Sequence, residues 1–345
     1  ASQDQQGVSM KLPVMTLALA AGIGFGIPAM AAELPKLHLP VDCTLGETCW
    51  VIQYPDMDPS DKAIDGAGLD RTYNTHKGVD IGIADLPTMN KGVAVLAPAD
   101  GKVLRARDEM PDVLVIDNAK REAVEDRECG NGMVIDHGNG LETQLCHMKL
   151  DSIIVKPGDM VKTGDKLGLV GASGLAAFPH LHVTTRLNGV VVDPTSGKAM
   201  QPDEAAKIST SGSLWAEPEL GTYDPFDIVQ IGFNTGAITI ETALAGDAYA
   251  EQVPTDPPAL VVWGVLYGVR AGDRLTMTIL DPEGAPFFDN TKTLDATKIR
   301  YYQFGGKKVR QPLPPGIYTG RVRIERDTDS GTIQETRQTT IRVGD

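Results

Sequence analysis

Residues 131–147 read NGMVIDHGNGLETQLCH, and this stretch decides the fold of the region around it. It holds two short apolar runs, Met133-Val134-Ile135 and a run that begins at Leu141, on either side of Asn139-Gly140. Asn-Gly between two apolar runs is a strong hairpin signal, because both residues accept the positive φ angles of a tight turn. The stretch therefore predicts two antiparallel strands joined by this turn.

The sequence on both sides of the hairpin repeats this alternation of apolar runs and turns. Further apolar runs occupy 93–96, 102–104 and 113–116, and two Gly-Asp turns, at 157–159 and 163–165, divide the segment after the hairpin. No pattern in this region predicts a helix of about ten residues or more. We therefore expect mostly β structure, with a barrel-like antiparallel β domain at residues 74–194.

The second half of the chain predicts another β domain. Pro, Gly, Ser, Asp and Glu dominate residues 195–226, which is typical of a linker, with a short helix near 203–208. Beyond it, charged and apolar side chains alternate around Tyr318, Val322 and Ile324, as in a half-buried strand. Strands are predicted at 259–266, 274–280, 317–324 and 332–343. We expect a C-terminal β-sandwich domain at residues 227–345.

The charge of the chain excludes some partners. Its 345 residues are enough for two ordinary domains, and its formal net charge is −14. An acidic chain repels phosphate groups, so nucleic acid is not an expected partner. The same charge argues against adhesion to an anionic membrane surface.

An uncharged stretch, 12–32, follows Lys11 near the start of the sequence. It ends with small residues at Ala29 and Ala31, the two positions that a signal peptidase reads. We therefore expect upstream residues and a cleaved signal peptide at 1–31, and a periplasmic or secreted protein. The alternative is a membrane anchor, since about 20 uncharged residues can span a bilayer. Residues 32–73 are then an N-terminal segment of sparse regular structure that wraps the next domain.

The chain has four cysteines, all beyond the signal stretch: Cys43, Cys49, Cys129 and Cys146. Export favours oxidation, so two disulfides are expected. We predict the pairs that are close in sequence, Cys43–Cys49 and Cys129–Cys146, because the second pair spans the hairpin. The alternative is a zinc site, but the spacings do not match paired C-x-x-C knuckles.

Several histidines occur in patterns that suit a metal centre. His180 and His182 lie in a predicted strand, where residues i and i+2 point to the same face. His76 and Asp80 are separated by a stretch in which Gly78 lets the chain turn, so that both side chains converge. Each pattern alone is weak. The first also fits a chance pair on an exposed strand, and the second an ordinary turn before a strand.

Taken together, these residues have the composition of a catalytic zinc site. Two histidines and one aspartate supply three protein ligands and leave the fourth tetrahedral position open. A structural site would fill all four positions. Two further histidines, His147 and His180, remain for proton transfer near neutral pH, although the sequence around His147 taken alone favours an ordinary core or surface histidine.

Three motifs in order resemble the lysostaphin/LytM-type zinc endopeptidases of bacterial cell walls: His76 to Asp80, Gln144 to Met148 and Phe178 to His182. The resemblance covers about a third of the chain. It implies one zinc ion per chain held by His76, Asp80 and His182, with His147 and His180 handling the water and the developing oxyanion. Cys146 departs from the pattern, because many relatives carry an aromatic residue or alanine there.

The resemblance implies a secreted zinc metalloendopeptidase that hydrolyses peptide cross-links of peptidoglycan. The bond is either the D-configured cross-link between stem peptides or a glycine-rich bridge. The disulfides and the cleaved-type signal favour a periplasmic enzyme, and hence the D,D bond. The alternative function is a zinc-retaining, non-catalytic scaffold or regulator of wall hydrolysis. A regulatory protein partner and the oligomeric state stay open.

Overall fold

The hairpin around Asn139-Gly140 is present. Strand β5 (Asn131–Asp136) pairs antiparallel with β6 (Leu141–Met148), and Asp136 faces Glu142 across the turn. Asn139 and Gly140 both have positive φ, at 52° and 77°. This computed structural model describes residues 33–344, so the predicted signal peptide lies outside the described residues.

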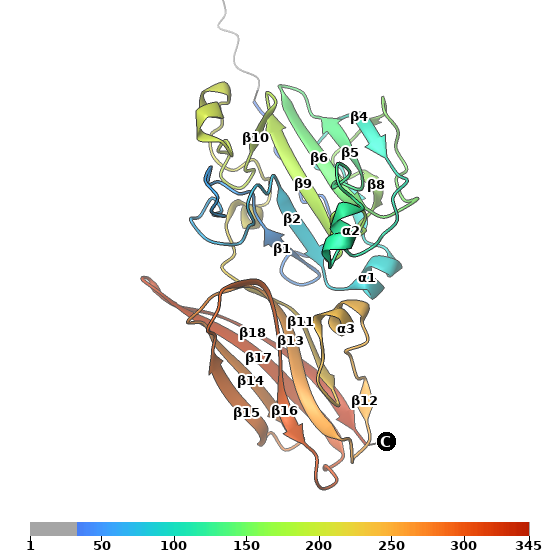
Figure 1. Ribbon diagram of the computed structural model, residues 1–345, viewed down its shortest axis with the longest axis vertical. Helices are drawn as coiled ribbons and strands as arrows, with labels where there is room; N and C mark the ends of the chain where they lie inside the picture. Colours follow the sequence, from blue (N-terminus) through green and yellow to red (C-terminus); the bar gives the residue numbers. More distant parts are fainter. Residues whose placement is uncertain (1–32, 345) are drawn as a thin grey trace, which may run out of the picture. The chain divides into compact units, whose positions relative to one another are not determined.

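The hairpin lies within an antiparallel sheet of order β1-β2-β9-β6-β5-β4-β7, in which β10 also pairs with β9 (Figure 1). The other members are β1 (Cys49–Gln53), β2 (Val79–Ile83), β4 (Gly101–Arg107), β7 (Met160–Val161), β9 (His180–Leu187) and β10 (Val190–Val192). The expectation of a mostly β fold is confirmed. The barrel-like closure is wrong, because β1 and β7 end the path and do not pair with each other.

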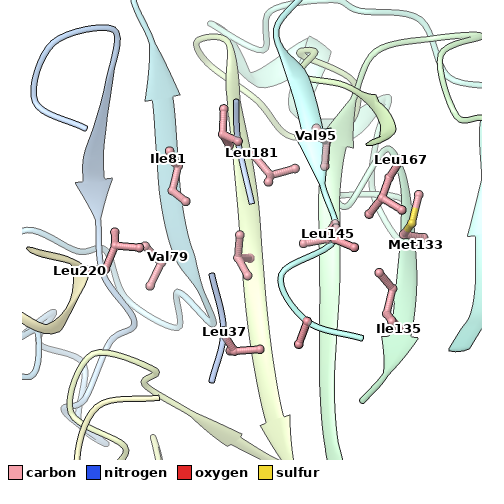
Figure 2. Close-up of a cluster of buried hydrophobic side chains, with 14 of the residues drawn as sticks. Leu37, Val79, Ile81, Val95, Met133, Ile135, Leu145, Leu167, Leu181 and Leu220 are labelled. Carbon is pink, nitrogen blue, oxygen red and sulfur yellow. The ribbon is translucent and has the colours of Figure 1, made fainter. Parts of the chain in front are cut away.

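The core lies against one face of this sheet. Leu181 and Val183 on β9 and Leu145 on β6 are fully buried there, and Figure 2 shows Leu145, Leu167 and Leu181 in the same cluster. Leu167 belongs to β8 (Lys166–Leu169), which forms a separate two-stranded sheet with β3 (Ala94–Leu96). Because side chains alternate along a strand, the polar residues between these positions point to the opposite face.

One segment differs from the expected structure. The apolar run 113–116 is not a strand but part of a long connection that carries helix α2 (Asn118–Glu122). Residues 33–73 hold sparse regular structure, as expected, and their one named strand, β1, is the edge strand that pairs with β2. The other helices are short: α1 (Leu86–Lys91), α3 (Ile240–Ala245), and the 3-10 turns Pro202–Lys207, near the expected helix, and Pro218–Gly221. Within 33–344, no helix has the length and apolar character that a membrane span requires.

The C-terminal half forms two sheets, of order β11-β13-β16 and β12-β18-β17-β14-β15. A shared core that includes Leu266 and Phe233 of one sheet and Val322 and Ile324 of the other joins them, as expected for a sandwich. The strands are β11 (Asp227–Asn234), β12 (Gln252–Val253), β13 (Ala259–Val269), β14 (Arg274–Leu280), β15 (Pro286–Thr293), β16 (Lys298–Lys308), β17 (Gly316–Thr328) and β18 (Gly331–Val343).

A third apolar cluster joins the two β regions, and residues 34–344 belong to one compact unit. Trp50, Ile52 and Phe178 from the first region pack with Trp263 and Tyr267 of β13. A buried arginine, Arg71, adds polar contacts beside the cluster. Its guanidinium donates to the carbonyls of Val51, Ile52 and Asp224 and pairs with the Asp227 carboxylate at 2.9 Å. The domain boundaries predicted above stay a prediction.

Asp224, beside this arginine, predicts a pH-dependent stability. Burial, followed by repulsion from Asp227, raises the pKa of the Asp224 carboxyl from 3.8 to about 6. Its contribution to stability is therefore complete below about pH 4 and is lost as the pH rises through 6. Asp224→Asn is expected to raise the free energy of unfolding by about 1–3 kcal/mol at pH 7.5 and to change it little at pH 4, as measured by urea titration. An equal change at both pH values would contradict this account.

Candidate metal and catalytic site

The register of the sheet brings Asp80 and His182 together. Asp80 on β2 lies directly opposite His182 on β9, and Cys146 on β6 faces His182 from the other side. His76 lies in the loop before β2, where Thr75 adopts a positive φ of 67°. Gly78 lies at a bend directly before β2, as expected. It allows a close approach, since a Cβ there would lie 2.6 Å from the Val183 carbonyl oxygen and 2.7 Å from the His182 ring.

Three ligand-type side chains converge at this point. The Asp80 Oδ1 atom lies 3.2 Å from His76 Nε2 and 2.8 Å from His182 Nδ1, and the two ring nitrogens are 3.2 Å apart. His76 and Asp80 are buried, and His182 is half-buried. Their ligand atoms all lie within 4.8 Å of one another, so the group could hold a metal ion.

Hydrogen bonds on the outer side orient the two imidazoles. The Nδ1 of His76 lies 2.7 Å from the Tyr54 carbonyl, and because a carbonyl only accepts, this nitrogen carries the proton. In the neutral ring, Nε2 therefore presents its lone pair to Asp80 and His182. His182 contacts Thr184 Oγ1 through its outer Nε2 at 2.9 Å. A lone pair, a second imidazole nitrogen and a carboxylate around one point form a donor set that fits zinc.

Two more histidines adjoin this group. His147 donates from Nδ1 to the Ser173 carbonyl at 2.8 Å, and His180 donates from Nδ1 to the Phe178 carbonyl, also at 2.8 Å. Each neutral ring therefore keeps an unprotonated Nε2. The Nε2 of His180 lies 3.7 Å from Asp80 Oδ1, and the His147 ring centroid is 4.6 Å from that of His180.

Burial and neighbouring charges determine which groups of the site are ionised near neutral pH. Burial and the neighbouring histidines lower the pKa of His147 well below its usual value, and burial outweighs the Asp80 charge to lower that of His180. Burial also opposes ionisation of Asp80, but the facing His76 and His180 hold its pKa well below the usual range. The carboxylate is therefore ionised near neutral pH, while His147 and His180 are neutral bases.

Several residues beside the site were not predicted from the sequence. Tyr54, Ser173 and Phe178 act through main-chain carbonyls, which carry no residue-specific signal. The ring of Tyr73, 44% exposed, lies against His76 with the centroids 4.4 Å apart. An aromatic residue close to a histidine motif is a signal that could have indicated it.

Phe178 also connects the site to the C-terminal sheets. Its ring stacks on His180 with a centroid separation of 4.4 Å, and Tyr267 packs against it at 5.7 Å. Arg300 on β16 lies over the same ring at 5.7 Å and donates to the Ala177 carbonyl at 3.2 Å. The loop that precedes His180 is therefore held from both sides.

Both predicted disulfides, Cys43–Cys49 and Cys129–Cys146, are present. The second lies beside the site, because Cys146 precedes His147 and the His147 N–H donates to the Cys129 carbonyl at 2.8 Å. His147 itself has a positive φ of 62°, which is uncommon for a residue with a side chain. This disulfide therefore anchors a residue in a strained backbone conformation.

We expect a Cys129→Ala/Cys146→Ala double variant to lose about 3 kcal/mol of unfolding free energy, because the bond closes a loop with a sequence separation of 17. Its kcat should also fall, because His147 loses its anchor. The control is Cys43→Ala/Cys49→Ala, whose bond has a separation of 6 and lies away from the four histidines. Urea titration and kcat test this. Equal kcat values in the two double variants would show that the bond does not position His147.

Three adjoining hollows surround the site. One of about 220 Å³ is lined by Asp80, His180, Phe178 and Arg121, and one of about 280 Å³ by His147 and His182. Tyr73 and Leu175 line both. The third, of about 320 Å³, shares Cys129 and Gln144 with the second. Asp80, His147, His180 and His182 therefore line two of the connected hollows of this cleft, and His76 is buried behind them.

The sequence profile of peptidase family M23 matches residues 74–194. These residues form an M23 peptidase domain. The M23 domain contains His76, Asp80, His147, His180 and His182, although their individual roles stay a prediction.

Similar proteins match part of this chain. An uncharacterized metalloprotease of Haemophilus influenzae is 32% identical over 123 residues, which is 36% of this chain and 21% of that protein. The peptidoglycan DD-endopeptidase ShyB of Vibrio cholerae is 42% identical over 64 residues, 19% of this chain and 15% of ShyB. The match thus spans about a fifth or less of these relatives. The catalytic domain of lysostaphin from Staphylococcus simulans is 24% identical, with a TM-score of 0.27 over 41% of this chain and 85% of that one.

Proposed function

We propose that this protein is an extracytoplasmic zinc metalloendopeptidase that hydrolyses peptide cross-links of peptidoglycan. The observation that carries the proposal is the group of His76, Asp80 and His182 within an M23 domain, with His147 and His180 beside it. The similarity to a peptidoglycan DD-endopeptidase supports the substrate, and the two disulfides support a location outside the cytoplasm.

His76, Asp80 and His182 would hold one zinc ion per chain. Zinc in such a site lowers the pKa of a water molecule and polarises the carbonyl of the scissile bond. The protein itself orients the two imidazole rings that would bind the zinc ion. The Tyr54 carbonyl and Thr184 hold the two ligand rings from outside, so that their inner nitrogens need no reorganisation when a cation binds.

His147 and His180 would carry the proton transfers. Each presents an unprotonated Nε2 toward the cleft, fixed by a carbonyl on the other side of its ring. One Nε2 can accept the proton of the attacking water and return it to the leaving amine. The other, once protonated, can donate a hydrogen bond to the oxyanion that develops on the substrate carbonyl.

A zinc-retaining regulator is the alternative, and it would need a blocked or incomplete site. Residues 32–73 are the segment that would act as the plug. β1 within that segment pairs with β2 as a strand of the sheet, and only the side chains of Gln53 and Tyr73 line the hollow beside His180. The open cleft and the five retained side chains therefore favour the enzyme.

Digestion of purified peptidoglycan tests the proposal. The zinc-loaded protein is incubated near neutral pH with cross-linked muropeptide dimers, and in parallel with pentaglycine, and the products are identified by mass spectrometry. We expect conversion of dimers to monomers that a chelator blocks. If only pentaglycine is cleaved, the scissile bond is in a glycine bridge and not in the stem-peptide cross-link. If neither substrate is cleaved, the result favours the regulator.

A further inference from the structure

The cleft continues from the metal group along the polar face of the sheet. The hollow lined by His147 and His182 also includes Thr184 and Arg186 of β9. It passes over Cys129 and Gln144 into the hollow lined by Arg105 and Arg107 of β4. A peptide bound at the metal group can therefore extend in this direction across four strands.

The strand register places the basic side chains on the same face as the site. His182, Thr184 and Arg186 are at alternate positions of β9, so their side chains point to one face. Thr184 pairs with Gln144 of β6, Gln144 with Val134 of β5, and Val134 with Arg105 of β4. This row crosses the sheet, with Arg186 next to one end of it and Arg105 at the other.

Basic side chains near the cleft form no close ion pair with a carboxylate of the described chain. Among residues 33–344, Lys77, Arg105 and Arg186 have no ion pair, whereas arginines elsewhere in the chain, such as Arg71, Arg127, Arg274 and Arg326, pair with carboxylates. The acidic side chains nearby are Glu128, which lines the hollow, and Glu142, which faces Arg186 across β6 and β9. A chain with a net charge of −14 thus keeps unpaired cations beside its site.

We propose that Arg105 and Arg186 bind free carboxylates of the peptide substrate. This inference rests on the proposed function and specifies that the peptide substrate carries free carboxylates. Stem peptides of peptidoglycan carry free carboxylates near the cross-link, whereas a glycine bridge has no side-chain charge to offer. Guanidinium groups bind carboxylates with two parallel hydrogen bonds. The cleft therefore selects cross-linked stem peptides over glycine bridges.

The test compares two substrates and three variants. The substrates are a cross-linked muropeptide dimer with free carboxylates and the same dimer with those carboxylates amidated. Arg105→Gln/Arg186→Gln is expected to lower kcat/KM for the free-acid dimer about 10- to 100-fold, mainly through KM, because hydrogen bonds to charged groups are lost. The single variants should each show part of this loss. For the amidated dimer, wild type and double variant should be equally poor.

The matched control is Arg321→Gln on β17, an exposed arginine that lines none of the three hollows and removes the same charge. It should behave as wild type toward both dimers. Equal kcat/KM of wild type for the two dimers, or an equal loss in the control, would overturn the inference.

Binding separates failure of the inference from failure of the proposed function. Isothermal titration measures both dimers with the wild type and the double variant, whether or not hydrolysis occurs. If no substrate is hydrolysed, the proposed activity fails, but tighter binding of the free-acid dimer by the wild type alone still supports the carboxylate site. If hydrolysis occurs but the free-acid and amidated dimers bind with equal affinity, the proposed activity is supported and the carboxylate inference fails.

Discussion

Alanine at His76, Asp80 or His182 is expected to remove the bound zinc and, with it, all measurable hydrolysis. Each variant leaves two protein ligands where the donor set requires three. Asp80 should be the most sensitive position, because its Oδ1 contacts both imidazoles and supplies the negative charge of the buried group. Asp80→Asn, which keeps the shape but not the charge, should therefore also lose most of the metal.

Zinc content per chain after dialysis, measured by mass spectrometry, checks this expectation directly. The control is His137→Ala, since His137 contacts the Asp100 carbonyl and Thr143 and lies outside the metal group. That variant should retain one zinc ion per chain. If all three ligand variants retained full zinc, the metal site would have to lie elsewhere.

His147→Ala and His180→Ala are expected to keep zinc and to lower kcat by about 10²–10⁴-fold, the contribution of a positioned acid–base group. Neither ring belongs to the group of three ligand-type side chains, and both keep an unprotonated Nε2 toward the cleft. Each substitution also leaves a carbonyl, of Ser173 or Phe178, without its donor. The free energy of unfolding should therefore fall by about 1–3 kcal/mol in each case.

The measurement is kcat together with zinc content and a urea titration for each variant. Retained zinc with lost kcat would agree with the assigned roles. A variant that keeps wild-type kcat would remove that histidine from the mechanism, and one that loses zinc would make it a ligand. The His137→Ala variant again serves as the histidine control.

The local pattern of the first sheet could be read from the sequence, but its closure could not. The Asn139-Gly140 turn and the alternation along β9 depend on neighbouring residues, which a sequence displays. Closure of the sheet into a barrel requires β1 to pair with β7, and no local sequence pattern predicts that pairing. The run 113–116 illustrates the same limit, because Val113 and Ile116 are apolar but about half exposed, and Val115 makes a single backbone bond to the Ala176 carbonyl rather than a ladder.

The candidate site divides in the same way. His76, Asp80, His147, His180 and His182 could be named from the sequence because ligands and bases require particular side chains. The atoms that orient them could not be named. They are main-chain carbonyl oxygens of Tyr54, Ser173 and Phe178, and every residue type has such an oxygen. The close approach at Gly78 could not be predicted for the same reason, since the strand that it must accommodate, β9, lies about a hundred residues away.

The apolar cluster of Trp50, Ile52 and Phe178 with Trp263 and Tyr267 bears on how such proteins can be recombined. A fragment that ended at residue 194 would expose three large apolar side chains, one of which stacks on His180. Such a fragment would lose solubility and the support of its reactive histidine together. A chimera that exchanges the C-terminal sheets for an unrelated binding module would meet the same obstacle. In this protein, the M23 domain and the C-terminal sheets share an apolar cluster, so engineering should keep the two together.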